Sequence, residues 1–210
     1  MGTGIATANN NAAEERVPAT AATADATTTA DPRSSAIPCA VITVSDRCAR
    51  GQEVDLSGPV LRKALAKRGY RVDLGSIIPD DLGEIYKAVR DALVAGARVI
   101  ITSGGTGVGP RDVTPEAVAS FIATPLPAME QLYIQESLRQ THFAALSRGR
   151  MGLTATTPKS LVICLPGSVK AAELAADVLF PLFNHALDQM DQTGVLQGKY
   201  SDHGGPSDDK

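Results

Sequence analysis

The first stretch of the sequence with a chemical signature is TSGGTGVGPRDVTPE, at residues 102–116. It carries four glycines and Asp112, and it directly follows the apolar run ARVII. Glycines at such a place let backbone N–H groups approach an anion without a Cβ atom in the way, and the N-terminus of a following helix adds about half a positive charge. The pattern therefore predicts a loop that binds phosphate.

This glycine-rich stretch does not match the common phosphate-binding motifs. Position 110 is proline where a G-x-G-x-x-G motif that starts at Gly105 needs glycine, and no Gly-Lys-Ser or Gly-Lys-Thr closes a P-loop. A dinucleotide-dependent oxidoreductase is therefore disfavoured, although it is kept as an alternative. A tight turn that only needs positive φ is another interpretation, but one or two glycines would be enough for it.

Acidic and hydroxyl side chains recur where other predicted strands end. They lie in VSDRCARGQEVDLSGP (44–59), IIPDD (77–81) and LPGS (165–168). A carboxylate beside a phosphate loop repels the ligand unless a divalent cation lies between them, and Mg²⁺ accepts one or two carboxylates together with phosphate oxygens. We therefore expect Asp80 and Asp112 to hold Mg²⁺ against a nucleotide, for phosphoryl or nucleotidyl transfer. A helix cap is the alternative role for Asp80.

Other chemistries lack the residues that they need. The three histidines lie far apart and form neither a zinc site nor a Ser-His-Asp arrangement, and the three cysteines form no C-x-x-C pair and indicate buried thiols in a reducing compartment. The net charge of -3 and the lack of a Lys/Arg block argue against a nucleic acid partner. No apolar run reaches the roughly 18 residues of a membrane span. We expect a cytoplasmic protein without membrane contact.

Apolar, β-branched runs that alternate with helical periods must position these residues. Four such runs are predicted strands, and they span residues 39–45, 70–77, 97–103 and 160–166. Because the runs are apolar throughout, they indicate an α/β fold with a parallel sheet that helices cover on both faces. In such sheets ligands bind outside the carboxyl ends of the strands, where the glycines and the acids lie.

Four helices are expected around these strands. Their predicted limits are 57–69, 80–96, from 114 onward, and from 168 to beyond 185. Ser57 is expected to cap the first helix and Asp80 or Asp81 the second. The last helix is expected to bury Leu174, Val178, Leu179 and Leu182. Turn signals within residues 144–163 predict a short hairpin before the final strand.

The two ends of the chain differ from its body. Residues 1–36 have no apolar segment and no hydrophobic period, which predicts a disordered tail. A transit peptide is the alternative, disfavoured because the segment contains four acidic residues. Residues 193–210 are expected to form a second polar tail, which leaves one domain over residues 37–192.

Six motifs occur in an order and spacing that resemble the molybdopterin-binding domain of the MogA/MoaB family, which gephyrin shares. They are VSDR, DLSGP, IIPDD, TSGGTG followed by RDVTPE, LSRG, and LPGS, and they cover about residues 39–190. The resemblance implies a three-layer α/β sandwich with a mostly parallel sheet. It also implies a homo-oligomer, commonly a trimer, with a hexamer as the larger alternative.

The activity that this resemblance implies is that of a molybdopterin adenylyltransferase, a Mg²⁺-dependent nucleotidyltransferase of molybdenum cofactor biosynthesis. Such an enzyme transfers AMP from ATP to the terminal phosphate of molybdopterin and releases pyrophosphate. A non-catalytic molybdopterin-binding or carrier protein of the same fold is the alternative.

By motif position, the resemblance implies that Asp80 and Asp112 are the catalytic carboxylates and the Mg²⁺ ligands. The residues that it implies for the phosphate loop and the rest of the substrate pocket are Ser45, Asp46, Ser57, Ser103, Gly104, Gly105, Thr106, Gly107, Ser147, Arg148, Pro166, Gly167 and Ser168. Ala128 and Val169 replace a glycine and a proline that are frequent in the family. These departures bear on the wall of the pterin site and not on the fold.

Overall fold

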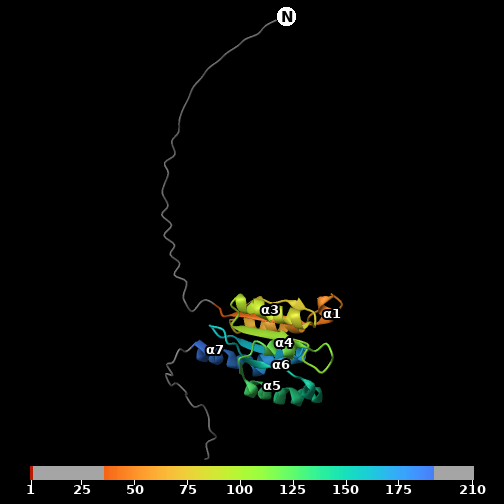
Figure 1. Cartoon of the computed structure of the whole chain (residues 1–210), viewed down its shortest axis with the longest axis vertical. Helices are drawn as coiled ribbons and strands as arrows, with labels where there is room; N and C mark the ends of the chain where they lie inside the picture. The colour runs from red at the N-terminus through yellow and green to blue at the C-terminus, as the bar shows by residue number, and fades with distance from the viewer. Residues whose placement is uncertain (2–35, 192–210) are drawn as a thin grey trace, which may run out of the picture. The chain divides into compact units, whose positions relative to one another are not determined.

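The computed structural model describes Met1 and residues 36–191 (Figure 1). The predicted tails, residues 1–36 and 193–210, therefore lie almost entirely outside the described residues. The structure describes nearly the same span as the predicted domain of residues 37–192, and the limits of that domain stay a prediction. Among the described helices, none is both long and apolar enough to cross a bilayer.

The body is built on one seven-stranded sheet. Its strands are β1 (Pro38–Val44), β2 (Arg71–Leu74), β3 (Ile77–Ile78), β4 (Val99–Ser103), β5 (Thr124–Pro125), β6 (Met151–Leu153) and β7 (Leu161–Leu165). The strand order is β2-β1-β4-β7-β6-β5, and β3 also pairs with β1. The pairings among β1, β2, β3, β4 and β7 are parallel, whereas β6 runs antiparallel to both β5 and β7. This arrangement confirms a mostly parallel sheet. The predicted short hairpin before the last strand is instead a hairpin of β6 with the last strand, β7, itself.

Helices cover both faces of this sheet and make three layers (Figure 1). One face is covered by α3 (Leu82–Val94) and α4 (Thr114–Ala119). The other is covered by α2 (Ser57–Ala66), α5 (Pro127–Gln140), α6 (Val169–Val178) and α7 (Phe183–Asp191). The short helix α1 (Asp46–Ala49) and the 3₁₀ turns η1 (His142–Leu146) and η2 (Phe180–Leu182) complete the body.

Alternate residues of the central strands pack into two separate cores. Val41, Ile101 and Ile163 lie side by side in the core under α2 and α6. Their chain neighbours Ile100 and Val162 point to the opposite core under α3 and α4. Since side chains alternate along a strand, a sheet that is buried on both faces needs apolar residues at every position. The continuous apolar runs in the sequence are the result.

Two predicted elements are interrupted. The expected strand 70–77 divides into β2 and β3 at Gly75, where φ is +148° and an added Cβ atom would lie 2.1 Å from the carbonyl oxygen of Val41. The expected last helix ends after Val178 and continues only after η2, because Pro181 has no N–H to donate and its ring obstructs the preceding helical turn.

The predicted buried face of the last helix was also wrong in part. Leu179 is buried, but Leu182 is 39% exposed and Leu174 and Val178 are only half-buried. Three alanines, Ala172, Ala175 and Ala176, form the buried face of α6 instead. Small side chains let α6 pack closely on its neighbour α2, since the distance between packed helices depends on the side chains at the contact.

Candidate functional site

The carboxyl ends of β1, β3 and β4 and the start of α6 surround a cavity of about 550 Å³, here called the acidic cavity. It brings together ten of the predicted site residues, namely Ser45, Asp46, Ser57, Asp80, Ser103, Gly104, Gly105, Asp112, Gly167 and Ser168. Their positions agree with the rule that ligands of parallel sheets bind at the carboxyl edge.

A second cavity of about 570 Å³, here called the apolar cavity, adjoins the first. It contains four of the five remaining predicted residues, namely Thr106, Gly107, Ser147 and Pro166, whereas the fifth, Arg148, lines neither cavity. Its other walls come from α5, η1 and α6 and include Tyr133, Phe143, Leu146, Ala171 and Leu174. Four residues line both cavities, and they are Gly105, Asp112, Gly167 and Ser168. The two cavities therefore meet at Asp112 and the two glycine turns.

The glycine loop, residues 104–109, needs glycine for steric reasons at its start. Gly104 and Gly105 have φ values of +116° and +63°, which side chains rarely adopt. A Cβ atom on Gly104 would lie 2.1 Å from the carbonyl oxygen of Val44, and one on Gly105 would lie 2.9 Å from Oδ1 of Asp80. The missing side chains thus let the loop lie directly against β1 and against a predicted catalytic carboxylate.

Asp80 is held by Asp46, which is the first residue of α1 and follows the N-cap Ser45. Its Oδ2 accepts the backbone N–H of Asp46 at 2.7 Å, and the backbone N–H of Asp80 donates in return to Oδ1 of Asp46 at 3.3 Å. The helix cap that the sequence offered as an alternative is provided by Asp81, which accepts the N–H groups of Gly83 and Glu84. Asp80 is therefore available to the acidic cavity.

Ion pairs distinguish among the five acidic residues that line the acidic cavity. Three are neutralised, through the pairs Asp46–Arg111 at 3.0 Å, Glu53–Arg47 at 3.2 Å and Asp55–Arg62 at 3.8 Å. In the part of the chain that the structure describes, no Lys, Arg or His nitrogen lies within 4.0 Å of the carboxylates of Asp80 or Asp112. These two carry the unpaired negative charge of the cavity.

The donor set of these two carboxylates fits Mg²⁺. Asp112 uses Oδ2 to accept the N–H of Gly109 at 2.8 Å, and Asp80 uses Oδ2 for Asp46. Among the described residues, no hydrogen bond engages Oδ1 of either carboxylate. Within residues 36–191, no group of three or more His, Cys, Asp or Glu residues is arranged so that it could hold a metal ion by itself. Mg²⁺ does not require one, since phosphate and water oxygens usually complete its shell.

Arg148 was predicted to bind ligand, but its guanidinium is committed to the protein. Nε donates to the carbonyl oxygen of Gly107 at 2.7 Å, while Nη2 donates to the carbonyl oxygen of Asp112 and Nη1 to the carboxylate of Glu116. The backbone N–H of Arg148 also donates to Thr106 at 2.9 Å. Arg148 thus holds the backbone of the glycine loop in place.

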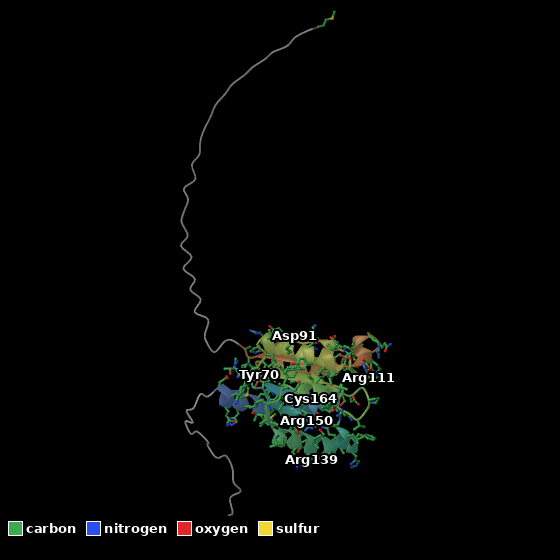
Figure 2. The ribbon with its side chains drawn as sticks, viewed as in Figure 1. Tyr70, Asp91, Arg111, Arg139, Arg150 and Cys164 are labelled. Atoms are coloured by element: carbon green, nitrogen blue, oxygen red, sulfur yellow. The ribbon has the colours of Figure 1, made fainter. Side chains whose placement is uncertain are left out.

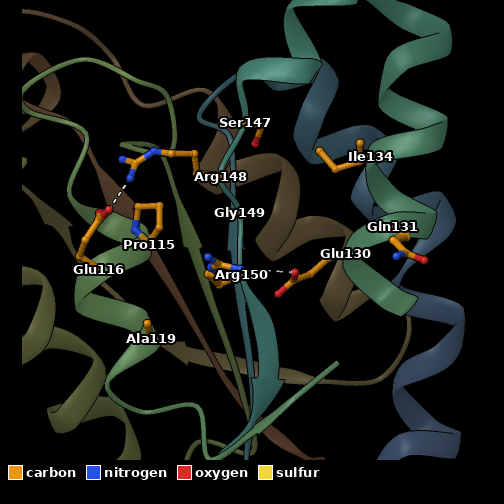
Figure 3. Close-up of a pocket in the computed structure, with 10 residues that line it drawn as sticks. All are labelled: Pro115, Glu116, Ala119, Glu130, Gln131, Ile134, Ser147, Arg148, Gly149 and Arg150. Carbon is orange, nitrogen blue, oxygen red and sulfur yellow. Dashed lines mark hydrogen bonds and ion pairs between the residues drawn. The ribbon is translucent and has the colours of Figure 1, made fainter. Parts of the chain in front are cut away.

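Figure 3 shows the pair of Arg148 and Glu116 at the wall of a third cavity of about 470 Å³, where a second, longer contact joins Arg150 to Glu130. Burial acts to raise the pKa of the Glu116 carboxyl, but the hydrogen bond from Arg148 and the nearby positive charges outweigh it. The pKa of Glu116 is therefore below its ordinary value.

Asp55 is a structural residue of the site that the predicted list omitted. It is 8% exposed and accepts the hydroxyl of Thr43 at 2.7 Å and the N–H of Gly58 at 2.9 Å. The second of these bonds satisfies an N–H in the first turn of α2, whose N-cap position is Leu56, so the predicted cap Ser57 is instead the first residue of the helix. The Ser57 hydroxyl donates to Asp55 at 3.4 Å and accepts that of Ser103 at 3.0 Å.

Arg111 was also missed, although it stands between the glycine loop and Asp112 in the sequence. Its Nε and Nη2 donate to the two carboxylate oxygens of Asp46 at 3.1 and 3.0 Å. These hydrogen bonds lower the pKa of the Asp46 carboxyl. Figure 2 shows Arg111 at the edge of the body. The signals in the sequence were a cation next to the predicted catalytic acid and its place at the start of the RDVTPE motif.

The three cysteines are free thiols, and Cys48 is half-buried rather than buried. Cys39 and Cys164 are buried in the two cores, and burial raises the pKa of their thiols to about 12 and about 11. Cys48 lies at the wall of the acidic cavity.

Comparisons with known proteins place the chain in one family. Residues 40–185 match the family described as "Probable molybdopterin binding domain". The chain is 34% identical over 152 residues to molybdopterin adenylyltransferase from Pyrococcus furiosus, covering 70% of this chain and 89% of that protein. It is 38% identical over 155 residues to the molybdenum cofactor biosynthesis bifunctional protein of Chlorobaculum tepidum, covering 74% of this chain and 49% of that protein.

The solved structures include the tungsten cofactor synthesizing protein MoaB from Pyrococcus furiosus, with a TM-score of 0.71 and 29% identity over 75% of this chain and 99% of that one. Several curated relatives are much longer than the matched region, so that the chain spans about half of their length or less.

Proposed function

We propose a specific reaction for this chain from one established premise, which is that it belongs to the MogA/MoaB family of molybdopterin-binding domains. Relatives carry names from molybdenum cofactor biosynthesis, and one is named a molybdopterin adenylyltransferase. The proposed reaction is the transfer of AMP from ATP to the terminal phosphate of molybdopterin, with release of pyrophosphate.

The observation that carries this proposal is the junction of the two cavities at Asp112. A group transfer between two substrates requires that both bind at once with their reacting atoms in contact. The acidic cavity offers hydroxyls, the backbone N–H of Gly105 and two unpaired carboxylates. The apolar cavity offers Tyr133, Phe143 and Leu174 to a planar heterocycle. Each substrate thus has a separate chamber, and the reacting phosphates meet at the shared wall.

The residues of the chain would act mainly by position and charge. In the proposed reaction an oxygen of the molybdopterin phosphate attacks the α-phosphorus of ATP, and the bond from that phosphorus to the bridging oxygen breaks as pyrophosphate leaves. Because a phosphate oxygen is already a nucleophile, the reaction needs no general base, in keeping with the predominance of positioning and electrostatics in such transfers. The glycine loop would hold phosphate oxygens through N–H groups other than those of Gly104 and Gly109, which already donate to Leu165 and Asp112.

Asp80 and Asp112 are the residues that would hold Mg²⁺. When bound, the ion would neutralise charge on the phosphates and orient them. The two Oδ1 atoms are the free donors on the protein side. The hydrogen bonds through Oδ2 would keep both carboxylates in place before substrate arrives.

The proposal also includes location and assembly. Three unpaired cysteines fit the reducing conditions of the cytoplasm. A homotrimer, or a hexamer, remains a prediction from the family, and light scattering of the purified chain measures it directly.

Product analysis tests the proposed reaction. The full chain is incubated with molybdopterin, ATP and Mg²⁺, and adenylated molybdopterin and pyrophosphate are measured by mass spectrometry and a coupled assay. We expect both products from the wild type and a loss on the order of 100-fold in Asp80→Asn. Asp81→Asn is the matched control with full activity, because asparagine caps a helix as well as aspartate does. If the wild type binds molybdopterin without forming product, the chain is a carrier and the proposal is wrong.

A further inference from the structure

Arg111 connects Asp112 and Asp80, the two acids of the proposed reaction, through the carboxylate of Asp46. It immediately precedes Asp112 in the chain, and its guanidinium donates hydrogen bonds to both carboxylate oxygens of Asp46. Asp46 in turn exchanges two hydrogen bonds with Asp80, one in each direction. A continuous set of contacts therefore runs from the residue beside Asp112 to the residue that holds Asp80.

We propose that Arg111 is a positioning residue that acts through Asp46 in two ways. It fixes the end of the glycine loop, and with it Asp112, at a set place relative to Asp80. It also neutralises Asp46, so that only two carboxylates of the acidic cavity remain free for a cation. The inference rests on the proposed function for the roles of Asp80 and Asp112, but not for the contacts themselves.

Direct binding of substrate by Arg111 has less support. Arg111 lines neither the acidic nor the apolar cavity, although Asp112 lines both. Two of its three guanidinium nitrogens already donate to Asp46. The two-oxygen contact has the fork geometry by which arginine gives both charge and direction, which lysine does not reproduce.

Removal of Arg111 has a consequence for charge that removal of Asp46 does not share. Without Arg111, the carboxylate of Asp46, which is 20% exposed, keeps one cation partner, Arg50 at 3.9 Å, together with the hydrogen bond from the N–H of Asp80. The negative charge of Asp46 beside Asp80 is then less well compensated. Without Asp46 the loop loses the same tie, but no new negative charge appears. The two changes therefore separate the positional role from the electrostatic role.

The first experiment uses the full chain without substrates. Hydrogen exchange of the segment 105–113 is compared among wild type, Arg111→Gln, Asp46→Asn and the matched control Arg50→Gln. We expect faster exchange at the amides of Gly109 and Asp112 in the first two variants and wild-type rates in the control, because Arg50 has only the 3.9 Å contact. Unchanged exchange in both variants would overturn the positional role.

The second experiment titrates Mn²⁺ alone, followed by electron paramagnetic resonance. We expect Arg111→Gln to bind Mn²⁺ severalfold more tightly than wild type, and the double variant Asp46→Asn/Arg111→Gln to lose this gain. Equal Mn²⁺ affinity in wild type and Arg111→Gln would overturn the electrostatic role. Thermal unfolding of every variant verifies that it is folded.

Kinetics connect the inference to the reaction. We expect Arg111→Gln and Asp46→Asn each to lower kcat on the order of 10-fold to 100-fold. The double variant should have a kcat no lower than that of the less active single variant, because both substitutions remove the same contact between Arg111 and Asp46. A raised KM for ATP with unchanged kcat in Arg111→Gln alone would show direct substrate binding and overturn the inference. If wild type forms no product, the proposed function fails, while hydrogen exchange and Mn²⁺ binding still decide the role of Arg111.

Discussion

Asp112 accepts the backbone N–H of Gly109 through Oδ2 at 2.8 Å, so the acid is bound to the same loop that it follows. Cβ atoms at Gly107 and Gly109 would lie 2.9 and 2.8 Å from this oxygen, which explains why glycine occupies both positions. The carboxylate and the glycine loop therefore form one rigid unit. A substitution at Asp112 changes either the charge or the loop, depending on what the new side chain retains.

This relationship predicts different outcomes for two variants of Asp112. Asparagine keeps an oxygen that accepts the N–H of Gly109, so Asp112→Asn should retain the thermal stability of the wild type and lose adenylation activity on the order of 100-fold. Alanine removes the acceptor as well, so Asp112→Ala should also lose about 1 kcal/mol of unfolding free energy. Urea unfolding and product formation measure the two effects. Equal activity of Asp112→Asn and wild type would rule out a charge-based role.

Arg148 leads to a second prediction, because its three donors hold carbonyls and a carboxylate rather than ligand. Lysine keeps the charge but not the planar fork, so we expect Arg148→Lys to cost about 1.5–3 kcal/mol in unfolding free energy and to lower kcat more than it raises either KM. Arg150→Lys is the matched control, since Arg150 is exposed and makes only a 3.9 Å contact with Glu130. A change confined to KM would return Arg148 to the ligand-binding residues.

The fold was predictable where one physical requirement governs a whole segment. A strand that is buried on both faces must be apolar throughout, and the runs that form β1, β4 and β7 were therefore located correctly. The run 70–77 forms the more exposed strand β2 and the short strand β3. Glycine at position 75 and proline at position 181 are residues that often interrupt strands and helices. The apolar pattern around each of them nevertheless predicted an unbroken element. The buried face of α6 was misjudged because alanines set its distance from α2, and alanine gives a weak hydrophobic signal.

The site was predictable as a set of residues but not as a set of partners. Motif position pointed to Asp80 and Asp112, and both line one cavity. Which acids keep their charge depends on pairs such as Asp46 and Arg111, which are 65 positions apart in the chain. The role of Arg148 likewise depends on carbonyls that are 41 and 36 positions away. Only the folded chain brings such partners together.

The lowered pKa of the Glu116 carboxyl predicts how its ion pair with Arg148, which holds the glycine loop, responds to acid. A carboxyl whose pKa is lower in the folded than in the unfolded chain stabilises the fold at any pH above its pKa in the unfolded chain, here ordinarily 4.5. This stabilisation is lost as the pH falls through the pKa of the folded chain. Unfolding free energy should therefore fall less between about pH 7 and about pH 3 in Glu116→Gln than in wild type. The difference should be small and should shrink in salt, because the Glu116 side chain is 48% exposed.

Glu136→Gln is the control for this acid response, because it removes an exposed pair with Arg139 on α5 that does not touch the loop. Its acid profile should match that of wild type. An identical profile in Glu116→Gln would show that the pair with Arg148 does not contribute to stability.

The cysteines provide a last prediction, which reports on the acidic cavity without a pterin substrate. Burial raises the pKa of Cys39 and Cys164 to about 12 and about 11, so at mildly alkaline pH both remain protonated inside the cores and react slowly. Cys48 lines the acidic cavity, and iodoacetamide should modify it first in the folded chain. ATP with Mg²⁺ should slow this reaction, as peptide mass spectrometry would measure, whereas Cys48→Ser should remove the fast phase. Modification of Cys48 at the same rate with and without nucleotide would place the triphosphate outside the acidic cavity.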